Sequence, residues 1–236
     1  MLGVDGWRGG WIGALVDADD HVEWQLLADA AAVVAVAAAV TAIDIPIGLP
    51  EDGVRRCDLE ARALLGAAGS SVFAAPTRPV LACATYAEAR EVLRQRGGAS
   101  MSAQAFGIVA KVRDVDSAIT RELQERVVEV HPELAFRRLG GADRMASKKT
   151  ASGVGARVAA LRRWLPDVDR ALSRAPVPVP IDDALDSLAC AWTAQRLLAG
   201  AVERLGDGAH DTRGLLMQIV VPTSVSSTAG YRPLTC

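Results

Sequence analysis

The hydrophobic positions of the first 50 residues predict a series of short strands interrupted by one helix. Apolar residues around Val4 and over 11–16 indicate two strands joined by a glycine-rich reversal, and residues 22–27 indicate a third strand. The Ala- and Val-rich segment 30–40 predicts a helix that packs flat on a sheet, because it offers no polar face. The apolar run 41–50, closed by prolines, is typical of a buried parallel strand.

The next part of the chain has a mostly helical pattern, which we interpret as an insertion over about 51–126 within a single domain. Its helices are predicted at 51–65, from Thr85 onwards with a capping box, and at 102–124 as one long helix. An ordered loop at 66–81 separates the first two.

The pattern after this insertion predicts a return to the sheet. Residues 126–133 alternate as a strand, 182–198 form an apolar-striped helix, and 214–221 indicate a last strand. We therefore expect one domain over 1–221, followed by a Ser/Thr-rich tail at 222–236.

Composition narrows the class of protein. The 26 basic and 28 acidic residues give a net charge of -2, so the global field neither attracts nor repels a polyanion. The four cysteines have no spacing typical of a disulfide framework or a zinc site. The longest apolar run, 30–43, is shorter than the roughly 20 residues that span a bilayer. We expect a soluble cytoplasmic protein that does not bind a membrane.

Five acidic residues stand at positions where a carboxylate needs an explanation. They lie in a glycine-rich hairpin, within the buried strand, in the later strand and at the start of the last long helix: Asp5, Asp44, Glu129, Asp183 and Asp186. A buried carboxylate is costly unless it is paired or binds a cation. Turn amides and the dipole of a helix N-terminus also favour acids at such places, so a purely structural role stays open.

The segment 137–163 carries the positive charge that the whole-chain sum conceals, with eight basic residues against one acid. Its centre offers Lys148 and Lys149 beside hydroxyl and backbone donors, which are groups that bind phosphate. We also assign phosphate contacts to Arg8, beside Trp7, and to Arg78 in the ordered loop. A solvated basic helix is the equally weighted alternative.

The order of elements matches a ribonuclease-H-like fold, an α/β fold with three antiparallel strands followed by parallel strands and flanked by helices. Acids at the strand ends and at the start of the last helix converge in such a fold. Sites of this kind hold two Mg²⁺ or Mn²⁺ ions roughly 4 Å apart for in-line phosphoryl displacement. Carboxylate oxygens suit these hard ions better than zinc.

Several sequence blocks resemble, in order over about 2–200, the family named domain of unknown function 429, whose members are predicted ribonuclease-H-like nucleases. The blocks are GVDGWRGGW, IDIPIGLP, RRCDLEAR, SSVFAAPTR, EVHPEL, SKKT and DDALDSLACAWTA. The last block is also similar to the terminal helix of Holliday-junction resolvases. The resemblance implies that the metal ligands are Asp5, Asp44, Asp183 and Asp186. Glu129 would be a further catalytic acid beyond the resolvase pattern.

We therefore expect a nuclease that uses Mg²⁺ or Mn²⁺ to hydrolyse nucleic acid or another phosphoester. Two alternatives stay open. One is a nucleotide-binding phosphotransferase of the actin-like or sugar-kinase type, and the other is a non-catalytic nucleic-acid-binding module. The sequence also leaves a homodimer open.

Overall fold

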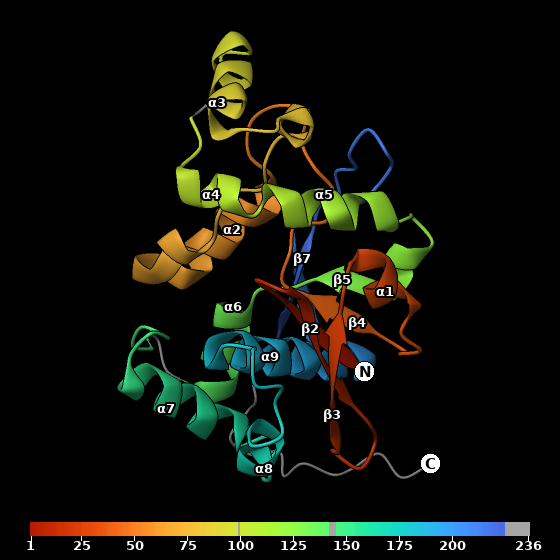
Figure 1. Ribbon diagram of the computed structural model, residues 1–236, viewed down its shortest axis with the longest axis vertical. Helices are drawn as coiled ribbons and strands as arrows, with labels where there is room; N and C mark the ends of the chain where they lie inside the picture. Colours follow the sequence, from red (N-terminus) through yellow and green to blue (C-terminus); the bar gives the residue numbers. More distant parts are fainter. Residues whose placement is uncertain (99, 142–144, 225–236) are drawn as a thin grey trace.

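The structure, a computed structural model, describes residues 1–98, 100–141 and 145–224. Its centre is a five-stranded sheet in the order β3-β2-β1-β4-β5 (Figure 1). The strands are β1 (Leu2–Trp7), β2 (Gly10–Val16), β3 (Val22–Leu27), β4 (Thr41–Ile43) and β5 (Val127–Glu129). The strand pairs β1–β2 and β2–β3 are antiparallel, whereas the pairs β1–β4 and β4–β5 are parallel. The predicted α/β fold with a mixed sheet is confirmed.

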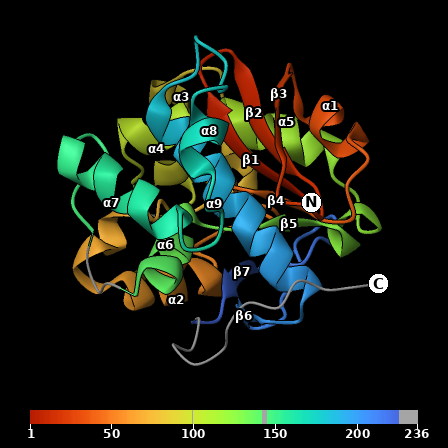
Figure 2. The ribbon, with the colours of Figure 1, turned by 90° about the horizontal axis from the view of Figure 1, so that it is seen from below.

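Helices cover both faces of this sheet. One face is covered by α9 (Ile181–Leu198), which crosses the strands, with α6 (Pro132–Gly140), α7 (Ala151–Leu161) and α8 (Val168–Leu172) on the same side (Figures 1 and 2). The other face is covered by α1 (Ala30–Ala35) and α5 (Val109–Ala118). No helix in the described ranges has the length and apolar character needed to cross a bilayer.

Side-chain alternation along the strands sorts residues between the two helical layers. Leu2 and Val4 of β1 pack in the core on the α5 side. Gly3, between them, faces α9, and a Cβ atom at Gly3 would lie 2.1 Å from both the Ser187 carbonyl oxygen and the Ala191 amide nitrogen. Only a glycine allows α9 to approach β1 this closely.

The chain between β4 and β5 is mainly helical. It contains α2 (Arg56–Leu65), α3 (Tyr86–Gln95), α4 (Ala103–Gly107) and α5, with short 3-10 turns at Gly66–Ser71, Arg78–Ala82 and Leu123–Glu125. The capping box at Thr85 is present as predicted.

Three predicted helices are longer than the observed ones. The helix expected at 30–40 ends at Ala35, where the β-branched Val36 is extended with φ -61° and ψ 130°. The helix expected at 51–65 begins only at Arg56. The helix expected at 102–124 divides after Gly107, a residue of low helix propensity, and its second part ends before Ile119.

The strand pattern also differs in four places. The strand expected at 41–50 ends at Ile43. The strand expected at 126–133 ends at Glu129, because Pro132 begins α6 after an extended His131. A second, two-stranded sheet pairs β6 (Val202–Leu205), which was not predicted, with β7 (Ile219–Pro222). The strand predicted at 214–221 is thus shorter. Most of the predicted tail, residues 225–236, lies outside the described residues.

Candidate functional site

Parallel pairing places two acids side by side at the carboxyl ends of neighbouring strands. Val4 of β1 stands opposite Ile43 of β4, and the Asp44 amide donates to the Val4 carbonyl at 3.1 Å. Asp5 and Asp44 are therefore neighbours on the adjacent strands β1 and β4. By side-chain alternation, Asp5 lies on the same face of the sheet as Gly3, which is the α9 face. Asp44 lies on the same face as Ala42, and Ala42 packs against Cys190 of α9. Asp44 lies just after β4, not inside a strand as predicted, and is partly exposed.

The helix α9 brings two more acids to the same place. Because α9 contacts Gly3, its residue Ser187 lies against β1. The preceding residue, Asp186, is 2% exposed and lies beside Asp5. Asp183 is one helical turn earlier and partly exposed. We call Asp5, Asp44, Asp183 and Asp186 the carboxylate site.

These four groups influence one another electrostatically. Burial raises the pKa of Asp5, and the carboxylates of Asp186, Asp44 and Asp183 raise it further. Burial also raises the pKa of Asp44 to about 8 and the pKa values of Asp183 and Asp186 to about 6. Buried acids that repel one another in this way favour the binding of a cation.

One lysine ammonium already lies among these acids. Lys148 Nζ donates to Asp186 Oδ2 at 2.5 Å. Burial lowers the pKa of Lys148, but the carboxylates of Asp186, Asp5 and Asp44 raise it above the ordinary value on balance. The other oxygen, Asp186 Oδ1, is buried and has no hydrogen-bond partner among residues 1–98, 100–141 and 145–224.

The loop that carries Lys148 is fixed by the first turn of α7. Thr150 caps this helix by accepting from the Gly153 amide at 3.1 Å. A Cβ atom at Gly153 would lie 1.9 Å from the Ser147 carbonyl oxygen, so only glycine permits the loop to pack here. Arg157 donates to the Ala146 carbonyl at 2.9 Å and pairs with Glu133. The sequence thus positions Lys148 through a capped helix and a buried arginine.

Glu129, the fifth predicted acid, has its side chain on the opposite face of the sheet from the carboxylate site, although its charge still raises the pKa of Asp44. It stands opposite Ile43 in the sheet register, and Ile43 packs on the α5 side, whereas Val128 and Val130 pack toward α9. Its carboxylate makes two hydrogen bonds with Arg55, at 2.6 and 2.7 Å, and accepts from the Ile47 amide at 2.7 Å. Burial raises the pKa of Glu129 to about 7, while Arg55 opposes this shift.

The four basic residues assigned to phosphate lie in different surroundings. Arg8 is exposed in the turn between β1 and β2, and Lys149 is exposed beside Lys148. Arg78 is held by other acids, since it pairs with Asp211 and with Asp116. Lys148 is therefore the member of this group that contacts the carboxylate site directly.

The basic segment 137–163 is not a uniform solvated face. Arg157 is 2% exposed, and Arg163 donates to the carbonyl groups of Leu139 and Gly140. Arg162 pairs with Asp169, and Arg144 lies outside the described residues. Much of the charge in this segment is thus used within the fold.

Two charged residues near the site were missed by the sequence analysis. Glu133 raises the pKa values of Asp44 and Asp186, although burial contributes more. Its place one turn after β5 could have indicated this. Lys111 of α5 donates to the Gly10 carbonyl and lies 4.3 Å from the centre of the Trp11 ring. No sequence signal connects α5 with the first hairpin.

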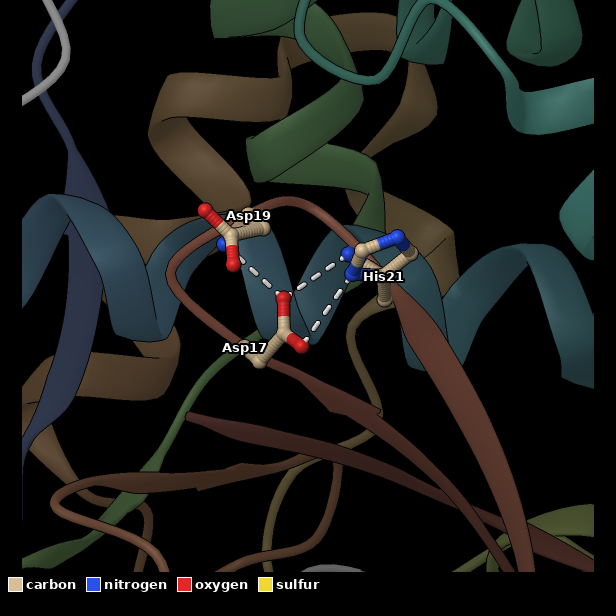
Figure 3. Close-up of side chains that lie close together, drawn as sticks. All are labelled: Asp17, Asp19 and His21. Atoms are coloured by element: carbon tan, nitrogen blue, oxygen red, sulfur yellow. Dashed lines mark hydrogen bonds and ion pairs between the residues drawn. The ribbon is translucent and has the colours of Figure 1, made fainter.

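A second acidic group lies in the turn between β2 and β3 (Figure 3). Asp17, Asp19 and His21 are, within the described ranges, the three side chains whose potential ligand atoms all lie within 4.8 Å of one another, so they could hold a metal ion. All three are exposed. Asp17 Oδ1 accepts from the amides of Asp19 and His21, both at 2.9 Å, and thereby closes the turn.

Comparison with known proteins gives one family. The model of the family described as "Protein of unknown function (DUF429)" matches residues 3–211, which confirms the resemblance inferred from the sequence blocks. Neither curated proteins nor solved structures gave a match.

Proposed function

The chain belongs to the DUF429 family, and from its carboxylate site we propose that it is a divalent-metal-dependent phosphodiesterase that hydrolyses nucleic acid. The observation that supports this is that one site holds more carboxylates than bonded cations. Four carboxylates from β1, from the end of β4 and from α9 act on one another, and among the residues that the structure describes the one ammonium bonded to them is that of Lys148. Such an arrangement costs stability unless it serves to bind a cation.

The chemistry of the donor set fits a hard divalent ion, although no three of these described carboxylates have oxygens that all lie within 4.8 Å of one another, so binding has to draw them together. Asp5, Asp44 and Asp186 would hold Mg²⁺ or Mn²⁺, with Asp183 at the more exposed rim. All the donors are carboxylate oxygens, which these ions prefer. Asp186 Oδ1 is buried and without a partner, and it gains one if a metal binds. When bound, such ions activate a water molecule and stabilise the leaving oxygen of a phosphodiester.

The remaining roles belong to the chain. Arg8, three residues after Asp5, and Lys149, next to Lys148, are exposed cations and would bind the phosphates that flank the scissile bond. Arg78 is paired with Asp116 and Asp211, and Glu129 is paired with Arg55, so we assign them no contact with substrate.

Nuclease assays on purified protein test this proposal. Labelled single-stranded DNA, duplex DNA, RNA and a four-way junction are incubated with Mn²⁺ or Mg²⁺ or with chelator. We expect metal-dependent cleavage of at least one substrate. Asp5→Asn and Asp186→Asn should each lower the rate by at least about 100-fold, since even outer partners of metal ligands typically cost 10- to 100-fold.

The control is Asp182→Asn, which changes an acid in the same turn of α9 whose charge raises the pKa of Asp183 at the rim but is not a leading influence on Asp5 or Asp186. It should retain cleavage. Circular dichroism establishes that each variant is folded. Equal cleavage by the wild type, Asp5→Asn and Asp186→Asn would overturn the proposal, as would the absence of any metal-dependent cleavage.

A further inference from the structure

Lys148 has the position that a bound cation would need. Its ammonium bonds the same carboxylate, Asp186, whose second oxygen has no partner. It also acts electrostatically on Asp5 and Asp44. In the described residues, no other basic side chain forms an ion pair with a member of the carboxylate site.

We propose that Lys148 is the built-in counter-ion of the metal-free carboxylate site and that a divalent metal ion displaces it. The proposal rests on the proposed function only in that a metal ion enters this site. A dication on either oxygen of Asp186, the free Oδ1 included, would lie close to the Lys148 ammonium on Oδ2, and the two cations repel each other strongly in this buried place. We therefore expect metal binding to break the bond between Lys148 and Asp186.

The geometry allows this exchange without unfolding. The Lys148 side chain is 35% exposed, whereas that of Asp186 is 3% exposed, so the lysine reaches a buried acid from a position that opens to solvent. Its loop is held separately, by the Thr150 cap and by Arg157. Breaking the ion pair therefore frees the flexible four-carbon side chain but leaves the loop in place.

Displacement links metal binding to phosphate binding. While Lys148 is bonded to Asp186, its ammonium is not available to a phosphate group. Once a metal ion has replaced it, the ammonium lies at the rim of the site beside the exposed Lys149. The metal-loaded protein then presents one more cation to a phosphodiester than the metal-free protein does.

Calorimetry with Mn²⁺ on the full chain tests the competition. We expect Lys148→Met, which keeps the length of the side chain but removes its charge, to bind Mn²⁺ roughly tenfold more tightly than wild type, because a charged hydrogen bond no longer has to be broken. Lys149→Met is the matched control and should bind as wild type does. Equal or weaker binding by Lys148→Met would overturn the inference.

A second measurement uses the wild-type protein and so does not depend on the folding of a variant. Acetic anhydride labels accessible amines, and mass spectrometry compares labelling of Lys148 with that of Lys149. Mn²⁺ should raise labelling of Lys148 several-fold and leave Lys149 unchanged. Unchanged labelling at saturating Mn²⁺ would refute displacement yet leave the metal site itself intact. If wild type and Lys148→Met both bind no Mn²⁺, the proposed function and this inference both fail.

Discussion

The two faces of the sheet each bury a cluster of acids, and the clusters differ in how completely they are paired. On the α5 side, Glu129 and Asp58 surround Arg55, whose guanidinium also donates to the carbonyl groups of Ile47 and Gly48. On the α9 side, the four acids of the carboxylate site share one bonded ammonium within the described part of the chain, that of Lys148.

Hydrogen bonding makes the contrast sharper. Asp58 accepts from the Ala75 amide at 3.0 Å and Glu129 from the Ile47 amide at 2.7 Å, in addition to their bonds with Arg55. In the carboxylate site, Asp186 Oδ1 is orphaned. A saturated buried network stabilises and fixes a fold, whereas a partly satisfied one is costly. The comparison teaches that pairing, more than burial, separates structural acids from candidate ligands.

The largest effect on stability is expected from removing the arginine of the paired cluster. Arg55→Met leaves the carboxylates of Glu129 and Asp58 buried without their cation, and removing one partner of a buried ion pair typically costs about 3–5 kcal/mol. We expect the free energy of unfolding, measured by urea titration, to fall by about that amount.

The neighbouring Arg56 supplies the control for this measurement. Its side chain is 60% exposed and pairs with Glu60 at 2.7 Å. Exposed pairs contribute about 0–1 kcal/mol, so Arg56→Met should change stability little. Similar losses in both variants would mean that burial of the Arg55 cluster does not matter as described.

The sequence predicted the sheet well because local patterns specify it. Period-two alternation and the glycine-rich reversal identify the hairpin strands, and the prolines after Ile43 identify the end of a parallel strand. Alternation also groups Val127 with Glu129. It does not tell which helical layer covers that face, so Glu129 was placed with the other acids and is instead bound to Arg55.

The partners of the acids could not be predicted for a related reason. Arg55 and Glu129 are 74 residues apart in sequence, and Lys148 and Asp186 are 38 apart. Such contacts depend on how α2 and the loop before α7 pack on the sheet, which no local pattern encodes. The sequence of the basic segment 137–163 likewise indicates one charged face, although Arg157 within it is buried.

An intermediate effect is expected from the unpaired cluster, with a defined pH dependence. The pKa of Asp44 rises from 3.8 to about 8 on folding. Between these values the folded wild type keeps a proton that the unfolded chain has released, so its stability falls as the pH rises. Asp44→Asn lacks this titration. In the absence of metal, its stability relative to wild type should therefore increase from pH 4 to pH 8.5.

The increase should be at least about 1.4 kcal/mol, the equivalent of one pKa unit. Urea titrations of both proteins at each pH measure it as a difference, which cancels the titration of groups that the two share. Saturating Mn²⁺ should reverse the order at pH 8, because wild type then gains the metal ligand that Asp44→Asn has lost. A difference that does not vary with pH would show that Asp44 titrates normally in the folded protein.

The smallest effect on stability is expected from a substitution in the exposed turn of Asp17, Asp19 and His21. This substitution also tests whether the metal ion binds in that turn or at the carboxylate site. Asp17 closes the turn because its Oδ1 accepts from two backbone amides, and the Oδ1 of an asparagine can accept the same two bonds. Asp17→Asn should therefore change stability by less than about 0.5 kcal/mol and leave the rise in melting temperature caused by Mn²⁺ unchanged. Asp186→Asn should abolish that rise. If Asp17→Asn abolishes it instead, the ion binds in the turn shown in Figure 3, and the buried acids beside α9 are not its ligands.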